Sequence, residues 1–201
     1  MIEIDEKKQE LAIIDKTGLS NVYENREQFD QLTRAANMLS KTSIIPQQYQ
    51  NKPADCFVAL EMAVRMGVSP MMVMQNLYVV KGKPSWAGQA CTALIAGCGK
   101  FKNVRHVYVG EKGKESRGCY VEAVRTDTED IVKGPEVTLK MAKDEGWTTN
   151  PKWRNMPELM LAYRASSFFA RVHCPEALMG MQTAEELCDI REQRAVMEDV
   201  L

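Results

Sequence analysis

Two arginines lie seven residues apart in an otherwise largely apolar stretch late in the chain. Arg164 and Arg171 fall within residues 155–172, a segment rich in Leu, Met, Tyr and Phe. Seven residues make about two helical turns, so both guanidinium groups project from one face of a helix. An unpaired charge on a buried face is costly. A row of phosphates as the ligand would be a reason for such a stripe, although for this helix taken alone a pair of solvated or salt-bridged arginines is the commoner explanation.

Other basic residues lie beside aromatic side chains, glycine turns and strand ends. Single-strand binders combine a basic groove with flat side chains that contact bases. Trp86 and Trp153 suit that role, although tryptophans are more often part of a core. Lysines and an arginine at 112, 114 and 117 lie on a polar hairpin. We predict a DNA-binding site formed by Lys81, Lys83, Lys100, Lys102, Arg105, Lys152, Trp153, Arg154, Arg164 and Arg171.

The charge is distributed unevenly, although the formal net charge is only −1. Residues 1–30 and 172–201 are acidic, whereas 78–126 carry nine Lys and Arg against three Glu. Residues 133–171 add seven basic residues against four acidic ones. A basic middle with acidic ends suits a protein that binds a polyanion, and ordinary surface patchiness is the alternative.

Several catalytic classes lack their motifs. The glycine-lysine pairs near 100 and 114 miss the spacing and the Ser or Thr of a P-loop. No pair of metal-ligand motifs is present, and His106 and His173 are interpreted as a strand residue and a helix-end residue. We therefore predict a binding protein rather than an enzyme, with no cofactor and no motif that requires Mg²⁺.

The six cysteines and the hydropathy pattern bear on the compartment. The cysteines are scattered without C-x-x-C pairs, which is typical of free thiols in a reducing cytosol. No apolar run approaches the ~20 residues of a membrane span. The acidic N-terminus lacks the pattern of a secretory signal. These features predict a cytoplasmic protein without a membrane partner.

The expected elements run helices, then strands, then helices. Apolar spacing predicts helices at about 26–41, 53–66 (apolar all round and so central), 69–75 and 86–98, and a strand at 77–80. Alternation predicts paired strands at 103–109 and 118–124 and a third strand within 127–133. The next expected elements are a helix at 138–145 and a loop at 147–154. They are followed by a long helix capped by Asn155 and Glu158 and by a last helix from about 183. This order indicates an α+β fold: a small antiparallel β-sheet of about three strands plus a short hairpin, packed with about five helices.

The predicted domain organisation is simple. Residues 1–24 form a mobile N-terminal segment with one apolar patch, LAII at 11–14. Residues 25–190 form one core domain, and residues 191–201 form an acidic helix end. The mobile segment and the hairpin at 110–117 are candidates for contacts between subunits.

The order of four sequence blocks resembles that of the RecT and lambda Beta family of phage single-strand annealing proteins. The first two blocks are AVRMGVSP at 63–70 and LYVVKGKP at 77–84. The third is Trp153 followed by MP at 156 and ML at 160. The fourth is YRASSFFAR at 163–171 with PEALMG at 175 and TAEE at 183. The likeness covers roughly residues 30–190.

The resemblance implies residue roles. In that family a positively charged groove holds one strand by its backbone, and the complementary strand pairs with the presented bases. Arg164 and Arg171 match basic positions of the long C-terminal helix, and Lys81 or Lys83 matches the lysine near the strand turn. Glu158 stands where the lambda protein has Lys, so the contacts differ there. The resemblance thus implies ATP-independent annealing on a cationic surface.

The resemblance also implies partners. These are single-stranded DNA, the annealed duplex intermediate, other copies of the chain in a ring or helical filament, a phage exonuclease and a host single-strand binding protein in the bacterial cytoplasm. The lambda protein has a further C-terminal region for partner proteins, whereas this sequence stops after one acidic helix. Two alternatives stay open: a DNA-binding accessory or replication module without annealing activity, and a metal-free hydrolase.

Overall fold

The chain forms two compact units, residues 1–75 and residues 76–201. The structure, a computed structural model, describes residues 22–80 and 82–189. The boundary at 75 falls inside the segment 25–190 that the sequence suggests as one core. Most of the N-terminal segment 1–24 and all of 191–201 lie outside the described residues.

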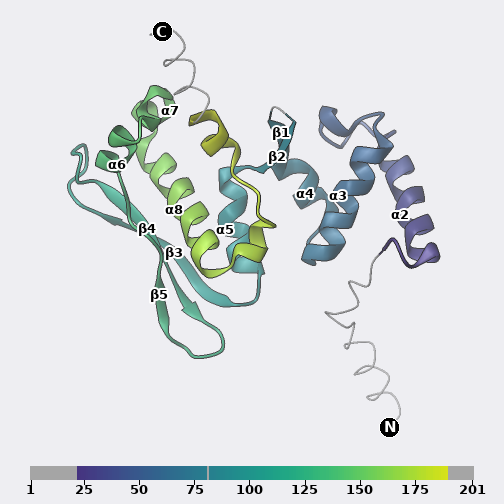
Figure 1. Cartoon of the computed structure of the whole chain (residues 1–201), viewed down its shortest axis with the longest axis horizontal. Coiled ribbons are helices and arrows are strands. Elements are labelled where there is room, and N and C mark those ends of the chain that lie inside the picture. Colours follow the sequence, from purple (N-terminus) through teal and green to yellow (C-terminus); the bar gives the residue numbers. More distant parts are fainter. Residues whose placement is uncertain (1–21, 81, 190–201) are drawn as a thin grey trace. The chain divides into compact units, whose positions relative to one another are not determined.

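The described part of the first unit is helical (Figure 1). It contains α2 (Arg26–Leu39), η1 (Gln47–Tyr49), α3 (Pro53–Met66) and α4 (Pro70–Asn76), whose last residue belongs to the second unit. Asn25 caps α2 by accepting the Gln28 N–H at 3.1 Å. Gly67, with a φ of 64°, ends α3 in the left-handed conformation that glycine tolerates best. The sequence thus predicts α3 with its ends and places α2 and α4 to within two residues, whereas η1 is missing from the prediction.

The prediction that α3, apolar almost all round, is a central helix holds for only part of its surface. Cys56 and Leu60 are buried, but Val58 and Val64 are 52% and 51% exposed. A helix that packs mainly against one other helix buries only a stripe of its surface, and α3 packs chiefly against α2 within this unit. Among the described residues no single helix is long and apolar enough to cross a membrane, and only the pair α3 and α4, bent by 119°, passes that test together.

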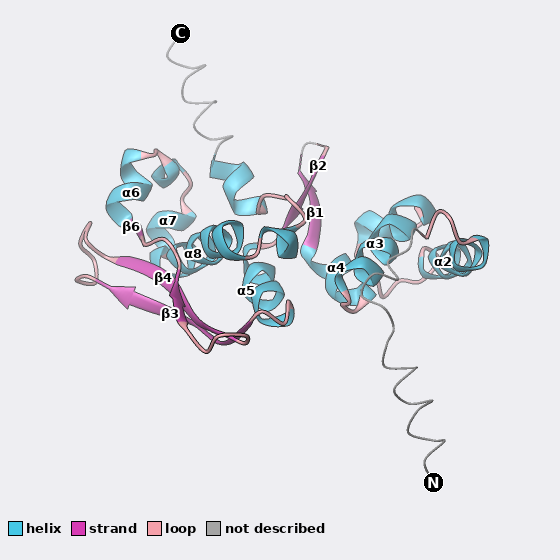
Figure 2. Ribbon diagram, turned by 60° about the horizontal axis from the view of Figure 1, so that its bottom comes forward, coloured by secondary structure: helices cyan, strands magenta, loops and turns pink. Residues whose placement is uncertain are grey.

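The second unit contains two small antiparallel sheets (Figure 2). A hairpin pairs β1 with β2, and in the larger sheet β3, β4 and β5 are neighbours in that order. The short strand β6 pairs with the beginning of β4 and is missing from the sequence prediction. The strands are β1 (Leu77–Val80), β2 (Lys83–Trp86), β3 (Phe101–Val109), β4 (Gly118–Arg125), β5 (Ile131–Lys133) and β6 (Val137–Thr138).

Two helices of the second unit, α5 and α8, lie side by side on one face of the larger sheet (Figures 1 and 2). Trp86, Val121 and Phe169 are fully buried in this core. Residues 184–189 form a further helical segment. The helices are α5 (Gly88–Gly97), α6 (Leu139–Asp144), η2 (Trp147–Thr149), α7 (Lys152–Asn155), α8 (Pro157–His173) and η3 (Pro175–Leu178). The fold is α+β, as the sequence predicts.

The residues that begin α8 differ from the prediction. Asn155 ends the single turn α7, and Met156, which caps α8, makes no side-chain cap hydrogen bond. Pro157 occupies the first turn, where its missing N–H costs nothing. The Glu158 carboxylate instead forms an ion pair with Arg117 at 2.8 Å. The predicted cap pair of Asn155 and Glu158 is therefore wrong, and part of the predicted loop at 147–154 is helical.

Candidate nucleic-acid interface

Helix α8 presents Arg164 and Arg171 on one face, as their spacing predicts, but that face meets carboxylates. Arg164 is only 8% exposed, and its Nη2 donates a hydrogen bond to Asp189. Its Nη1 lies 3.5 Å from Glu186 Oε1. Arg171 Nη2 lies 2.5 Å from Glu186 Oε2, and its side chain is 38% exposed. The salt-bridged alternative thus describes both arginines in this conformation.

Glu186 also organises the chain segment that carries it. The Thr183 N–H donates to Glu186 Oε2 at 2.8 Å, and the Glu186 N–H donates to Thr183 Oγ1 at 3.2 Å. This reciprocal pair is a capping box, which starts the helical segment at 184–189. The Ser167 hydroxyl donates to Glu186 Oε1 at 2.7 Å. One carboxylate therefore caps a helix and fixes that helix to α8.

Asp189 collects a second set of donors in the interior. It accepts from Asn150 Nδ2 at 3.0 Å, from the Trp153 indole N–H at 3.2 Å and from Arg164. Trp153 is 3% exposed, so it cannot stack on a base in this conformation. The predicted role of Trp153 as an exposed platform is corrected accordingly, because its indole N–H has a buried carboxylate to bind.

The pKa shifts reflect the balance between burial and pairing in this cluster. Burial lowers the pKa of Arg164, although Glu186 and Asp189 oppose that shift. Burial raises the pKa of Asp189 against its donors. For Glu186, burial acts upward, but Arg171, the Thr183 N–H, Arg164 and Ser167 together lower its pKa. Two cations and two anions thus compensate one another, which is how buried charges are usually retained.

A partly exposed side chain that the sequence-based site omits, Trp147, lies against this cluster. The Arg164 Cζ lies 4.0 Å from the centroid of the Trp147 ring and 6.0 Å from the centroids of Trp153 and Phe168. A guanidinium over an aromatic face is stabilised by the ring quadrupole. Arg164 is therefore held by aromatic rings as well as by carboxylates.

The three cations of the β3 region are exposed and form surface ion pairs. Lys100, at the start of the strand, pairs with Glu176 at 2.5 Å. Lys102 pairs with Glu129 at 2.5 Å, and Arg105 pairs with Glu122 at 2.6 Å. A bulge separates Lys102 from Arg105. The Lys100 and Lys102 pairs are exposed on both sides and contribute little to stability, so a phosphate can replace the carboxylate at low cost; in the third pair the Glu122 side chain is only 12% exposed.

Five cations in the described part of the second unit have no described carboxylate within 4.0 Å. Lys83 lies at the start of β2, and Lys152 and Arg154 lie on α7 either side of the buried Trp153. The other two lie on the β3–β4 hairpin. Lys81 lies outside the described residues. The five are Lys83, Lys112, Lys114, Lys152 and Arg154.

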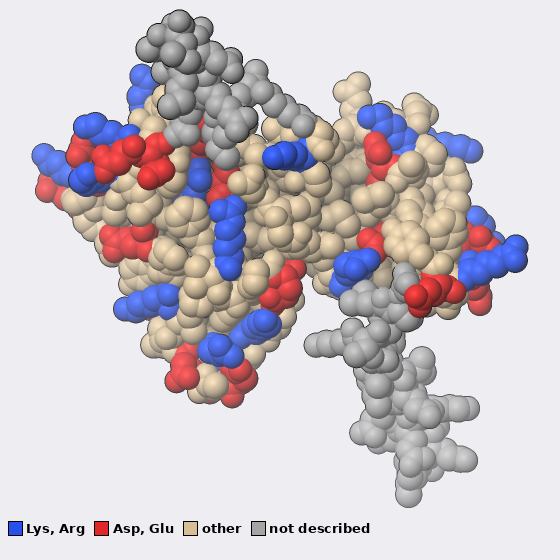
Figure 3. All heavy atoms as spheres, in the orientation of Figure 1, with Lys and Arg blue, Asp and Glu red and all other residues tan. Residues whose placement is uncertain are grey.

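The basic residues do not gather into one uninterrupted band on the face that Figure 3 draws. Blue and red side chains lie next to one another over α6 and the β3–β4 hairpin (Figure 3). On α6, Lys140 pairs with Asp144 and Lys143 with Glu115. Of the residues in the predicted site, Lys83, Lys152 and Arg154 are therefore the exposed cations for which no described carboxylate competes with a polyanion.

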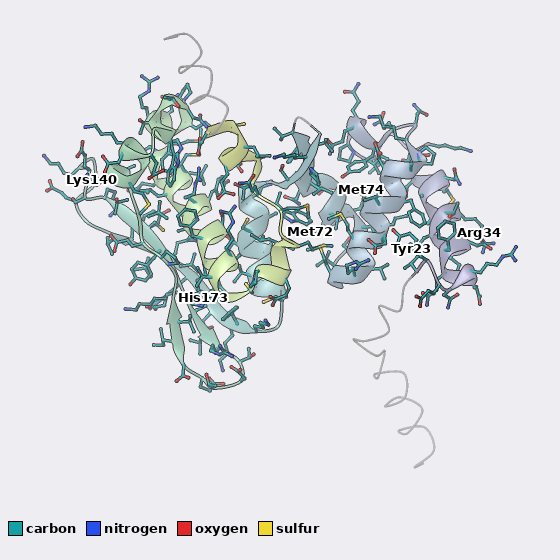
Figure 4. All side chains as sticks on the ribbon, viewed as in Figure 1. Tyr23, Arg34, Met72, Met74, Lys140 and His173 are labelled. Carbon is teal, nitrogen blue, oxygen red and sulfur yellow. The ribbon has the colours of Figure 1, made fainter. Side chains whose placement is uncertain are left out.

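The two histidines have structural contacts, as their interpretation from sequence implies. His106 on β3 lies 2.7 Å from the hydroxyl of Ser166, which in turn lies 3.0 Å from the hydroxyl of Thr92. Ser166 is fully buried, so this pair joins the sheet to α8 rather than facing a substrate. His173 ends α8, with its Nε2 3.2 Å from the Lys133 carbonyl oxygen (Figure 4).

The predicted site omits Glu186, Asp189 and Trp147, and the sequence carries a local signal for only the first of these residues. The TAEE motif at 183 predicts a helix start, but not that its second glutamate binds two arginines. Nothing local to Asp189 or Trp147 indicates contact with Arg164, because these residues lie 25 and 17 positions away along the chain. Such pairs depend on how α8 packs.

Taken together, these elements define an α+β protein with a helix-on-sheet core and several exposed cations that no described carboxylate pairs. A model described as the RecT family matches residues 32–199, and the chain belongs to that family. RecT proteins are DNA-binding phage proteins of single-strand annealing and recombination. No curated protein and no solved structure matches the chain. The resemblance drawn from the sequence blocks is thus confirmed at the level of the family.

Proposed function

We propose that this chain is an ATP-independent annealing protein that binds one DNA strand by its phosphates and promotes its pairing with a complementary strand. The observation that carries the proposal is the family match over residues 32–199. It is supported by the exposed cations Lys83, Lys152 and Arg154, for which no described carboxylate competes. Lys100 and Lys102 add cations whose exposed pairs are easily exchanged, and Arg105 adds an exposed guanidinium that is bound to the mostly buried Glu122.

The proposed mechanism is electrostatic and needs neither a nucleotide nor a metal cofactor. Cations that neutralise phosphates release condensed counterions, which favours binding, and they reduce the repulsion between two approaching strands. Holding one strand extended lowers the entropic cost of pairing. Arg164 and the buried Trp153 contribute by stabilising the scaffold, while Arg171 is partly exposed and can add a contact if its bond with Glu186 opens.

Annealing over many nucleotides requires several copies of the chain on one strand. We propose a homo-oligomer, a ring or a helical filament, built from heterologous contacts. The exposed β3–β4 hairpin at 110–117 is one candidate contact, and the segment 1–24 is another. A phage exonuclease that generates single strands and a host single-strand binding protein are the proposed partners.

The test is annealing of complementary oligonucleotides without ATP or metal at two salt concentrations, about 50 mM and about 200 mM. The proposal expects a faster pairing rate that falls steeply with salt. Binding of single strands without faster pairing would instead favour the alternative, a DNA-binding accessory module. Absence of binding at the lower salt concentration would contradict both functions.

A further inference from the structure

The geometry points to Trp147 as a base-stacking platform that makes the cationic surface selective for unpaired DNA. This inference rests on the proposed function and names the group that would distinguish a single strand from a duplex. Trp147 lies at the start of η2, directly after Gly146, whose φ is 69°. It is partly exposed, whereas Trp86 and Trp153 are 0% and 3% exposed. It is therefore the tryptophan of this chain that an external ligand can reach.

The indole ring of Trp147 is fixed in orientation by three neighbours. Arg164 covers one face at 4.0 Å from the ring centroid. Phe168 meets the ring edge-to-face, with centroids 6.3 Å apart and planes at 85°. Trp153 lies 5.5 Å away at 34°. Because the side chain is already ordered, stacking a ligand on it would cost little further conformational entropy.

The exposure of Trp147 and its indole N–H distinguish it from the two buried tryptophans. Asp189 and Glu186 bind the Arg164 guanidinium that lies on the indole, and the Trp147 side chain is partly exposed. The Trp86 and Trp153 indole N–H groups donate to buried acceptors. Among the residues that the structure describes, the Trp147 N–H has no acceptor. A tryptophan that only completed a core would usually have its N–H satisfied.

Cations that could hold a backbone next to such a platform lie on the adjoining helix. Helix α7 packs against η2, and Lys152 and Arg154 extend from it without a described carboxylate partner. A flat ring beside free cations is the combination that single-strand binders use, because every base has a face to stack and every nucleotide has a phosphate. Bases of a duplex are already stacked on one another, so Trp147 would add affinity for an unpaired strand alone.

The test uses the full chain, oligothymidylate, an abasic strand of equal length and a duplex. Oligothymidylate should quench the tryptophan fluorescence of the unmodified protein, and the abasic strand should not, because it has no bases to stack. The quenching reports Trp147 because Trp86 and Trp153 are buried. Trp147→Phe should abolish the quenching while keeping most of the affinity. Trp147→Leu should weaken binding to oligothymidylate on the order of 5- to 100-fold. It should leave affinity for the abasic strand and the duplex unchanged.

The possible failures can be told apart. If the unmodified protein binds oligothymidylate without quenching, or if Trp147→Leu binds it as tightly as the unmodified protein, the platform is refuted while the proposed function stands. If Trp147→Leu weakens binding to all three ligands equally, the ring has only a scaffold role, and the inference is again overturned. If the unmodified protein binds no single strand at all, the proposed function itself fails.

Discussion

Two groups of basic residues, about ten positions apart in the chain, have opposite environments. Arg164 and Arg171 on α8 face Glu186 and Asp189, and Arg164 is buried. Lys152 and Arg154 on α7 are exposed, and no described carboxylate pairs with them. The first group has two anions for two cations, so its charge is used within the fold. The second group leaves its charge to solvent or to a ligand.

The contrast shows that helical spacing locates charges without showing what they bind. In both groups the basic residues lie near aromatic side chains, which is the pattern that predicts a nucleic-acid site. What separates them is the segment 183–189, which supplies the carboxylates to α8 and none to Lys152 or Arg154. Variants of the two groups should therefore differ in kind, with a stability effect in one and a binding effect in the other.

The largest expected effect is on stability, from Arg164→Met. The substitution leaves the buried carboxylates of Glu186 and Asp189 short of a partner, which should lower the free energy of unfolding by about 3–5 kcal/mol. Urea unfolding of the full chain measures the loss. Adding Asp189→Leu should recover part of it, since the unpaired anion is then removed. An Arg164→Met protein with unchanged stability and weakened DNA binding would instead restore Arg164 to the phosphate site.

The next largest effect concerns binding. Lys152→Gln with Arg154→Gln should leave the thermal midpoint unchanged and reduce affinity for single strands. If each residue neutralises one phosphate, the slope of log affinity against log salt should become shallower by about 1.4. The matched control is Lys140→Gln with Lys143→Gln on α6, which removes the same charge from cations already paired with Asp144 and Glu115. Equal effects of the two double variants would mean that only net charge matters.

A smaller effect concerns the pH dependence of the free energy of unfolding, to which His106 should contribute. Burial lowers the pKa of this histidine below its ordinary value, so the folded state holds it neutral while the unfolded chain takes up a proton. The free energy of unfolding should therefore decline as the pH falls below about 6.5. His106→Gln should flatten the decline between about pH 8 and 5.5, and His173→Gln, which changes the other histidine, should keep it. An unchanged profile in His106→Gln would assign the decline to other groups.

The smallest effect should come from freeing one surface cation. Glu176→Gln removes the partner of Lys100, and both side chains are more than half exposed. Stability should change little, because exposed pairs are weak. The salt dependence of single-strand binding should steepen by up to about 0.7 if Lys100 gains a phosphate. An unchanged slope would show that Lys100 lies away from the bound strand.

Local patterns predicted the fold well because they depend on near neighbours in the chain. The proline start and Gly67 end of α3 and the pairing of β3 with β4 follow from a few consecutive residues. The site was harder to predict. Trp153 and Arg164 look like ligand-binding residues until Asp189 is brought to them by packing that no local spacing encodes. Lys152 and Arg154 are exposed, and their contact with DNA stays a prediction.

The position of the capping box at Thr183 and Glu186, late in the chain, has a consequence for folding during synthesis. Domains fold as synthesis proceeds from the N-terminus. The arginines of α8 emerge from the ribosome before Glu186 and Asp189 do, so until then no carboxylate from 183–189 can reach them. The second unit can therefore complete its core only when this segment has emerged from the ribosome, and a nascent chain halted before that point should remain open to proteases.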